Sequence, residues 1–184
     1  MFATGFLVLA ACLLAQAIVG DDVWNRSRRR RYFFPGFGFA MGLAMWPVAV
    51  FARGSTIHLL AHCTWAQVMM LAGGAELGLV RGKLRNPLWR LCVAVAFFVS
   101  GAALIIHEQN GWFFQRSAFL HHLIGWTVIG ASLFAIGRAL RRRSLVFESG
   151  FALTFVLLAV FLYCDRDLAP IFGHLSPLAG TPHR

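Results

Sequence analysis

Long apolar runs separated by short polar segments dominate the pattern of this chain. A helix that crosses a bilayer needs about 20 mostly apolar residues. The predicted helices cover residues 2–20, 37–51, 57–80, 88–107, 118–140 and 145–164. Arginine clusters, glycine or proline bound each run, as expected where helices end at an interface. The pattern predicts an all-α, polytopic helical membrane bundle with about six transmembrane helices, forming a single integral membrane domain over residues 1–184.

Composition agrees with a chain surrounded by lipid. Of its 184 residues, 59% are hydrophobic and 13% charged, and the mean hydropathy is +0.68. Soluble domains carry roughly 25% charged residues, so a lipid bilayer is the predicted partner of the apolar surface. The net charge of +10 comes from short clusters between apolar runs and not from a basic surface interleaved with aromatic residues, which argues against nucleic acid. The four cysteines lack paired-motif spacing, which argues against a disulfide framework or a zinc finger.

The distribution of basic residues predicts the orientation. If the first helix runs from outside to inside, the outer segments hold only four of the 17 basic residues: Arg53, Arg116, Arg166 and Arg184. The inner loops hold the other thirteen: Arg26, Arg28, Arg29, Arg30, Arg31, Arg81, Lys83, Arg85, Arg90, Arg138, Arg141, Arg142 and Arg143. Cytoplasmic loops are enriched in Lys and Arg. We therefore expect both termini outside and the arginine-rich loops in the cytoplasm, in a plasma or inner membrane.

The first run also has some features of a signal peptide. Ala15-Gln16-Ala17 is similar to a cleavage site, but the run has no positive n-region. After cleavage, the basic segment Arg26–Arg31 would have to cross the membrane. We therefore expect a retained helix.

Ionisable residues gather at the helix ends that are predicted to face outside. His58 and His62 open the third run, His107 and Glu108 close the fourth, and His121 and His122 open the fifth. His58 and His62 stand at i and i+4, so both imidazoles project from one helix face and can chelate one ion. Neutral imidazoles are good ligands for zinc, copper and iron. Ionisable residues inside a membrane mark functional sites by default.

Three interpretations of this histidine cluster stay open. The leading one is a transition-metal site, copper or zinc, with His62, His107 and His121 as ligands and His58 or Glu108 completing the shell, for ion handling or an associated redox complex. The alternative is a b-type haem with two axial ligands from His62, His107, His121 and His122. The third is a non-catalytic subunit of a larger membrane complex, in which the histidines only form hydrogen bonds. No nucleophile triad, P-loop or dinucleotide fingerprint is present, which argues against an enzyme.

Glu76 is a lone acid in an apolar run, fourteen residues after His62 and toward the inner half of the membrane. It is expected either to form a hydrogen bond that packs helices or to belong to a proton or ion path. Glycines nearby predict close helix contacts, since small residues let backbones approach. They are Gly73, Gly74 and Gly78, together with Gly125 and Gly130 on the fifth run.

A set of short motifs resembles the transmembrane protein 45 family. The motifs are His62 followed by Glu76, Phe98-Val99-Ser100-Gly101 leading to His107, and Leu120-His121-His122-Leu123. The resemblance supports a multi-span membrane fold and singles out His62, Glu76, His107 and His121, but it implies no reaction. The chain departs from the family where aromatic residues precede Pro35-Gly36 and where Gln109 replaces a second histidine. The resemblance favours His121 as a ligand, whereas the small-residue stripe around Gly125 favours His122.

Overall fold

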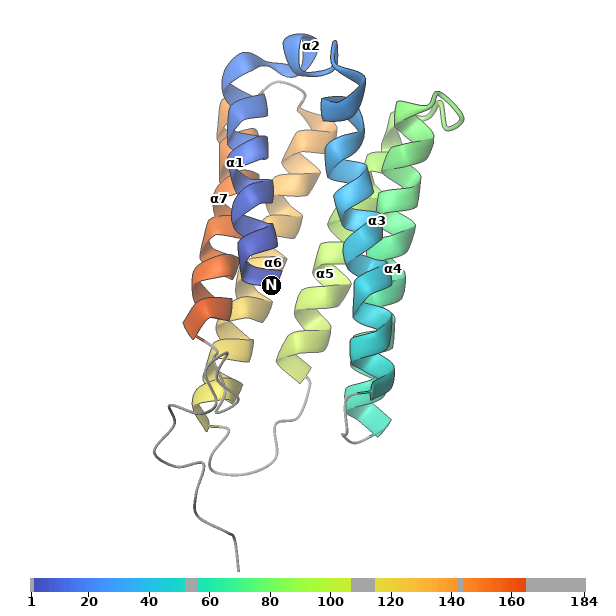
Figure 1. Cartoon of the computed structure of the whole chain (residues 1–184). Helices are drawn as coiled ribbons and strands as arrows, with labels where there is room; N and C mark the ends of the chain where they lie inside the picture. Colours follow the sequence, from blue (N-terminus) through green and yellow to red (C-terminus); the bar gives the residue numbers. More distant parts are fainter. Residues whose placement is uncertain (1, 52–55, 107–114, 142–143, 165–184) are drawn as a thin grey trace, which may run out of the picture.

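The computed structural model describes residues 2–51, 56–106, 115–141 and 144–164, and in these ranges the chain is helical throughout, without strands (Figure 1). The all-α prediction is confirmed for this part of the chain. The elements are α1 (Phe2–Val19), α2 (Asp21–Trp24), α3 (Arg28–Phe51), α4 (Thr56–Val80), the 3₁₀ helix η1 (Pro87–Arg90), α5 (Leu91–Ile106), α6 (Gln115–Leu140) and α7 (Leu145–Cys164).

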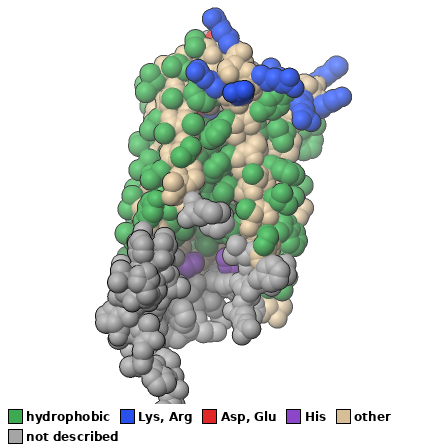
Figure 2. Space-filling model, in the orientation of Figure 1, with side chains coloured by type: hydrophobic (Ala, Val, Ile, Leu, Met, Phe, Trp, Pro, Cys, Tyr) green, Lys and Arg blue, Asp and Glu red, His purple; other side chains and the backbone are tan. Residues whose placement is uncertain are grey.

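The six long helices run alternately up and down in a single bundle (Figure 1). They pack in the order α3, α4, α5, α6, α7 and α1, whereas α1 and α3 touch only slightly. The start of α1 and the end of α7 point to one end of the bundle, and α2 and the α4–α5 connection lie at the other (Figure 1). Every lysine and arginine side chain that the structure describes belongs to segments 26–31, 81–90 or 138–141, which meet at this second end (Figure 2). We call it the arginine end.

Within the described part of the chain, four helices are long and apolar enough to cross a membrane. They are Leu59–Val80, Pro87–Ile106, Phe119–Leu140 and Leu145–Cys164, and Ala3–Val19 is a shorter apolar helix. Large apolar side chains cover the outside of the bundle, among them Leu71 (62% exposed) and Trp126 (62% exposed) (Figure 2). Exposing so large an apolar surface to water is unfavourable, whereas exposing it to lipid is not. The architecture therefore indicates an integral membrane protein in contact with a lipid bilayer.

Helix α3 begins at Arg28, well before the predicted apolar run at 37–51. Its first turn is closed by the Arg31 amide, which donates to the carbonyl of Ser27 at 3.0 Å. Arginine has a high helix propensity, so the basic cluster continues the helix beyond its apolar part. This extension places Arg30 and Arg31 at the arginine end.

Aromatic stacking and close glycine contacts hold the interior together. The rings of Phe97, Phe151 and Phe155 lie with centroids 5.1–5.6 Å apart and in edge-to-face geometry. Between α5 and α6, a Cβ added to Gly101 would lie 2.6 Å from the carbonyl oxygen of Gly125. Of the glycines expected at close contacts, Gly125 therefore lies in one, whereas Gly130 faces open space.

Candidate functional site

The histidines that the structure describes lie at the end opposite to the arginine end (Figure 2). His62 is half-buried on α4 and, with Trp65 and Ser100, lines a small cavity of about 10 Å³. On α6, His121 is half-buried and His122 is exposed. Of these two neighbours, His121 is therefore the one less accessible from outside the bundle.

The predicted metal site cannot be assembled from the described residues alone. His107 and Glu108 lie outside the described ranges, and so does the side chain of His58, although its backbone belongs to α4. Within the described part of the chain, no group of three His, Cys, Asp or Glu side chains could hold a metal ion. The copper, zinc and haem interpretations stay predictions.

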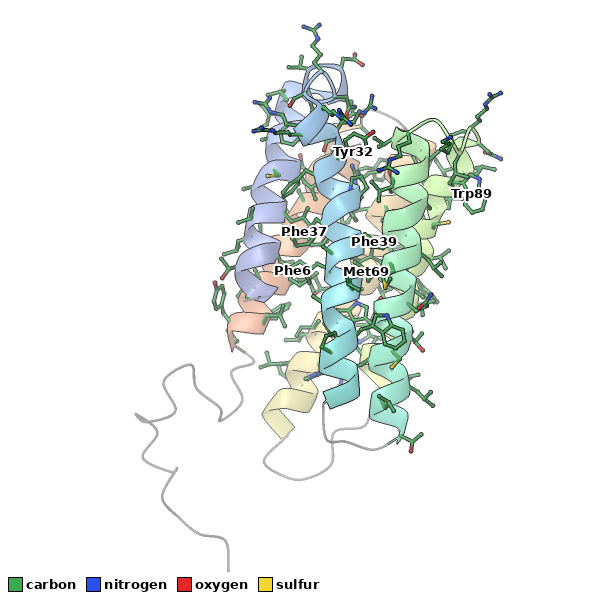
Figure 3. The ribbon with its side chains drawn as sticks, turned by 45° about the vertical axis from the view of Figure 1, so that its right-hand side comes forward. Phe6, Tyr32, Phe37, Phe39, Met69 and Trp89 are labelled. Carbon is green, nitrogen blue, oxygen red and sulfur yellow. The ribbon has the colours of Figure 1, made fainter. Side chains whose placement is uncertain are left out.

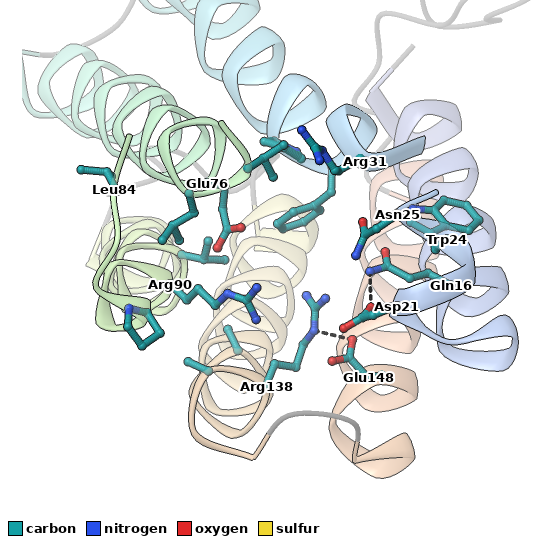
Figure 4. Close-up of a pocket in the computed structure, with 18 of the residues that line it drawn as sticks. Gln16, Asp21, Trp24, Asn25, Arg31, Glu76, Leu84, Arg90, Arg138 and Glu148 are labelled. Atoms are coloured by element: carbon teal, nitrogen blue, oxygen red, sulfur yellow. Dashed lines mark hydrogen bonds and ion pairs between the residues drawn. The ribbon is translucent and has the colours of Figure 1, made fainter. Parts of the chain in front are cut away.

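Glu76 belongs to a different site, a polar cavity of about 450 Å³ at the arginine end (Figure 4). We call it the arginine cavity. Its walls come from all the helices that meet there: Gln16 of α1, Asp21 and Trp24 of α2, Arg30 and Arg31 of α3, Glu76 of α4, Arg90 of η1, Arg138 of α6 and Glu148 of α7, with Arg85 from the loop before η1. Small-molecule sites typically measure about 300–1,000 Å³, so this cavity has the size of a binding site.

Arg138 is the most firmly held cation of the cavity. Its Nε donates to Oε2 of Glu148 at 2.6 Å, and the two side chains are only 18% and 15% exposed. Its guanidinium also lies 4.6 Å from the ring centroid of Phe151 and 5.6 Å from that of Phe34. Charge-assisted hydrogen bonds and cation–π contacts are strongest where water is excluded. These contacts leave the terminal amino groups of Arg138 directed into the cavity (Figure 4).

Arg90 and Glu76 complete the inner part of the cavity. Arg90 closes η1, whose start is fixed by the Asn86 side chain accepting the Leu88 amide at 2.9 Å. The Glu76 carboxyl group points toward the guanidinium groups of Arg90 and Arg138 (Figure 4). Among the described residues, however, Arg138 forms an ion pair with Glu148, and Arg90 forms none. Arg90 therefore keeps its donors available to a ligand.

At the rim, contacts among polar side chains and Trp24 shape the entrance. The Gln16 amide donates to Asp21 at 2.7 Å, and the Trp24 indole donates to the carbonyl of Arg30 at 3.1 Å. The guanidinium of Arg30 lies 5.5 Å from the Trp24 ring centroid. Beside it, Arg31 donates to the hydroxyl of Tyr32 at 3.5 Å, and this hydrogen bond lowers the pKa of Tyr32.

The cavity wall carries more positive than negative charge. Five arginines and three carboxyl groups line it. The inner set of Glu76, Arg90, Arg138 and Glu148 is balanced, and the excess comes from the exposed rim arginines. Guanidinium groups bind phosphate and carboxylate through paired hydrogen bonds. The arrangement is therefore suited to attract an anion and to hold it between Arg90 and Arg138.

Sequence reasoning singled out Glu76 but treated its partners only as signals of orientation. A usable signal was present in Arg138 and Glu148, which carry opposite charges ten residues apart across the turn between two apolar runs. Helices joined by so short a connection are antiparallel neighbours, so these side chains had to lie close together. The contribution of Arg90 depends on the 3₁₀ turn, which the apolar pattern did not reveal.

No protein-family model, curated protein or solved structure matches the chain. The resemblance to the transmembrane protein 45 family stays a prediction.

Proposed function

We propose that this integral membrane protein binds an anionic ligand in the arginine cavity. One observation supports the proposal above the others: two half-buried guanidinium groups, Arg90 and Arg138, extend into one cavity of about 450 Å³ (Figure 4). Ionisable residues at membrane depth face water-filled cavities or protein partners and mark ligand or ion sites. Glu76 lies near the end of the candidate span Leu59–Val80 that belongs to the arginine end, at a depth where such a site is expected.

The proposed orientation places this cavity on the cytoplasmic side. The described basic side chains gather at one end of the bundle, and Lys and Arg are retained preferentially in cytoplasmic loops. A ligand would then enter from the cytoplasm or from the inner leaflet, past the exposed Arg30, Arg31 and Arg85 at the rim. These charges raise the local concentration of anions at the entrance. In this proposal six helices cross the membrane and both termini lie outside.

Thermal unfolding in phosphate and in chloride of equal ionic strength tests the anion site. A ligand that binds only the folded state raises the unfolding temperature. We expect inorganic phosphate to stabilise the purified protein beyond chloride, and Arg90→Gln to reduce this difference to the part that phosphate gives any folded protein. Arg29→Gln is the matched control, because Arg29 is an exposed arginine of the same end that does not line the cavity. An equal stabilisation by phosphate in the wild type, Arg90→Gln and Arg29→Gln would contradict the proposal.

A second function is proposed for the opposite end, where His62 and His121 are half-buried on helices α4 and α6. There a transition metal, copper or zinc, would be held by His62, His107 and His121, with His58 or Glu108 completing the shell. Elemental analysis and visible absorption of the purified protein separate this function from a b-type haem. Single changes of the three histidines to alanine should lower occupancy without unfolding. A folded preparation with neither metal nor haem would favour the role of a non-catalytic complex subunit.

A further inference from the structure

Two smaller cavities lie deeper in the bundle than the arginine cavity. Below it lies a middle cavity, which shares Phe34, Pro35, Glu76 and Val93 with the arginine cavity. A distal cavity follows and shares Phe6, Met69 and Phe97 with the middle one. Figure 3 shows the direction of this row, with Tyr32 near the arginine end, Phe37 below it, and Phe6 and Met69 at mid-height. The three cavities therefore form one row along the bundle axis.

The chemistry of the walls changes sharply along this row. The arginine cavity is lined by arginines and carboxyl groups, whereas in the middle cavity Glu76 is the one ionisable side chain among those described. The distal cavity has methionine, aromatic and aliphatic walls, with Ser100 and the Trp65 indole as its polar groups. Water needs several polar partners to occupy an internal cavity, so the lower two cavities are unsuited to water or ions. Their apolar walls match a hydrocarbon chain in chemistry.

We infer that the ligand is a single-chain amphiphile, with a phosphate or carboxylate head between Arg90 and Arg138 and its hydrocarbon tail in the middle and distal cavities. This inference rests on the proposed function and names the class of ligand. The head supplies the negative charge that the guanidinium groups attract, and the tail covers apolar walls that no polar solute can use.

The cavities are narrow, so a tail enters them only when the side chains around them repack. The middle and distal cavities measure about 20 and 40 Å³. Met41, Met45 and Met69 line them, and methionine side chains repack readily because they are flexible and unbranched. Helices α1 and α3, which flank the middle cavity, touch only slightly. The ring centroids of Phe6 and Phe37 lie 6.2 Å apart across this gap, so a tail that enters between the two helices from the bilayer displaces these two side chains.

The length of the row sets the length of the tail. Glu76 and Trp65 are eleven residues apart on α4, which corresponds to about 16 Å along the helix axis at 1.5 Å per residue. An extended chain of about twelve carbons advances about 1.25 Å per bond along its zigzag and reaches about 14 Å, which is most of that distance. The end of such a tail would lie beside Trp65 and Ser100.

Photocrosslinking locates the tail directly. The full chain is reconstituted in phosphatidylcholine nanodiscs with a dodecyl phosphate that carries a diazirine at the end of its chain, and crosslinked residues are mapped by mass spectrometry. We expect labels on distal-cavity residues such as Met45, Trp65 and Met69, and their loss with excess unmodified dodecyl phosphate or in Arg90→Gln. Labels confined to lipid-facing residues such as Leu71 and Phe98 would overturn the inference.

A matched pair of variants on α4 adds a control for folding. Ala72 lines the middle cavity, and Ala75 is equally buried but faces a separate cavity that is not part of the row. Ala72→Leu should abolish the interior labels, and Ala75→Leu should keep them. If Ala72→Leu does not fold, the wild-type label map still decides. If inorganic phosphate stabilises the protein but only lipid-facing residues are labelled, the anion site is supported and the amphiphile is rejected. If phosphate gives no stabilisation and no interior residue is labelled, both proposals are rejected.

Discussion

Arg138 donates a 2.6 Å hydrogen bond to Glu148 while its guanidinium lies 4.6 Å from the ring centroid of Phe151. This arrangement joins the end of α6 to the first turn of α7 and fixes one wall of the arginine cavity. It also uses only Nε of the guanidinium in the ion pair, so that the terminal amino groups stay directed inward (Figure 4). One side chain thus serves both the packing of two helices and the cavity.

The first prediction concerns the energetic coupling of this pair. A double-mutant cycle of Arg138→Gln and Glu148→Gln, measured by reversible unfolding in mixed micelles, should give a coupling free energy of about 0.5–3 kcal/mol. Each single change leaves a half-buried charge without its partner, and the double change removes both charges. Additive effects of the two substitutions would show that the ion pair contributes nothing to stability.

Adjacent glycines on α4 give a second prediction with a built-in control. A Cβ added to Gly73 would lie 2.5 Å from the backbone nitrogen of Phe39 on α3, whereas a Cβ added to Gly74 would meet nothing within 4 Å. Gly73→Ala should lower the free energy of unfolding by about 1–3 kcal/mol, because backbone cannot move aside as a side chain can.

In contrast, Gly74→Ala should be neutral or raise the free energy of unfolding by up to about 1 kcal/mol, since alanine is the better helix former. Both variants are compared by the same unfolding assay in micelles. Equal effects of the two substitutions would mean that α3 and α4 are not packed as closely as described.

The sequence predicted the helices well because each apolar run has the length and composition of a membrane helix. The run at 145–164 coincides with α7, and the predicted start and end of α4 lie within one residue of those observed. The pattern could not show how far the basic cluster extends α3, since arginine is compatible with both helix and loop. Nor could periodicity indicate which of Gly73 and Gly74 faces a neighbour, because the helices are apolar on all sides.

The candidate site was predictable only in part. Glu76 stood out because a lone acid in an apolar run demands a partner. Its neighbours in the structure are Arg90 of η1, which packs against α4 directly, and Arg138 of α6, which lies beyond α5. The order in which these helices pack is a property of the tertiary fold and cannot be read from the apolar pattern. The histidine cluster was predicted from helix ends that lie partly outside the described residues, so His107 and Glu108 keep the status of predicted ligands.

The third prediction tests the orientation. With the four native cysteines replaced by alanine, Lys83→Cys at the arginine end should resist a membrane-impermeant thiol reagent added to intact cells. Thr56→Cys, an exposed position at the start of α4 and thus at the opposite end, should react. The reason is the retention of basic loops in the cytoplasm. Labelling of Lys83→Cys with protection of Thr56→Cys would reverse the orientation and place the cavity outside.

The electrostatic balance inside the arginine cavity provides the most direct test of the anion site. Glu76 and Arg90 line the same cavity, and an ionised Glu76 repels the anion that Arg90 attracts, so we expect neutral substitutions at these positions to change anion affinity in opposite directions. Calorimetric titration of the purified protein with phosphate should give an affinity about tenfold higher for Glu76→Gln and about tenfold lower for Arg90→Gln, each equivalent to about 1.4 kcal/mol. Arg29→Gln should leave the affinity unchanged. Equal phosphate affinities for the wild type, Glu76→Gln and Arg90→Gln would contradict the account.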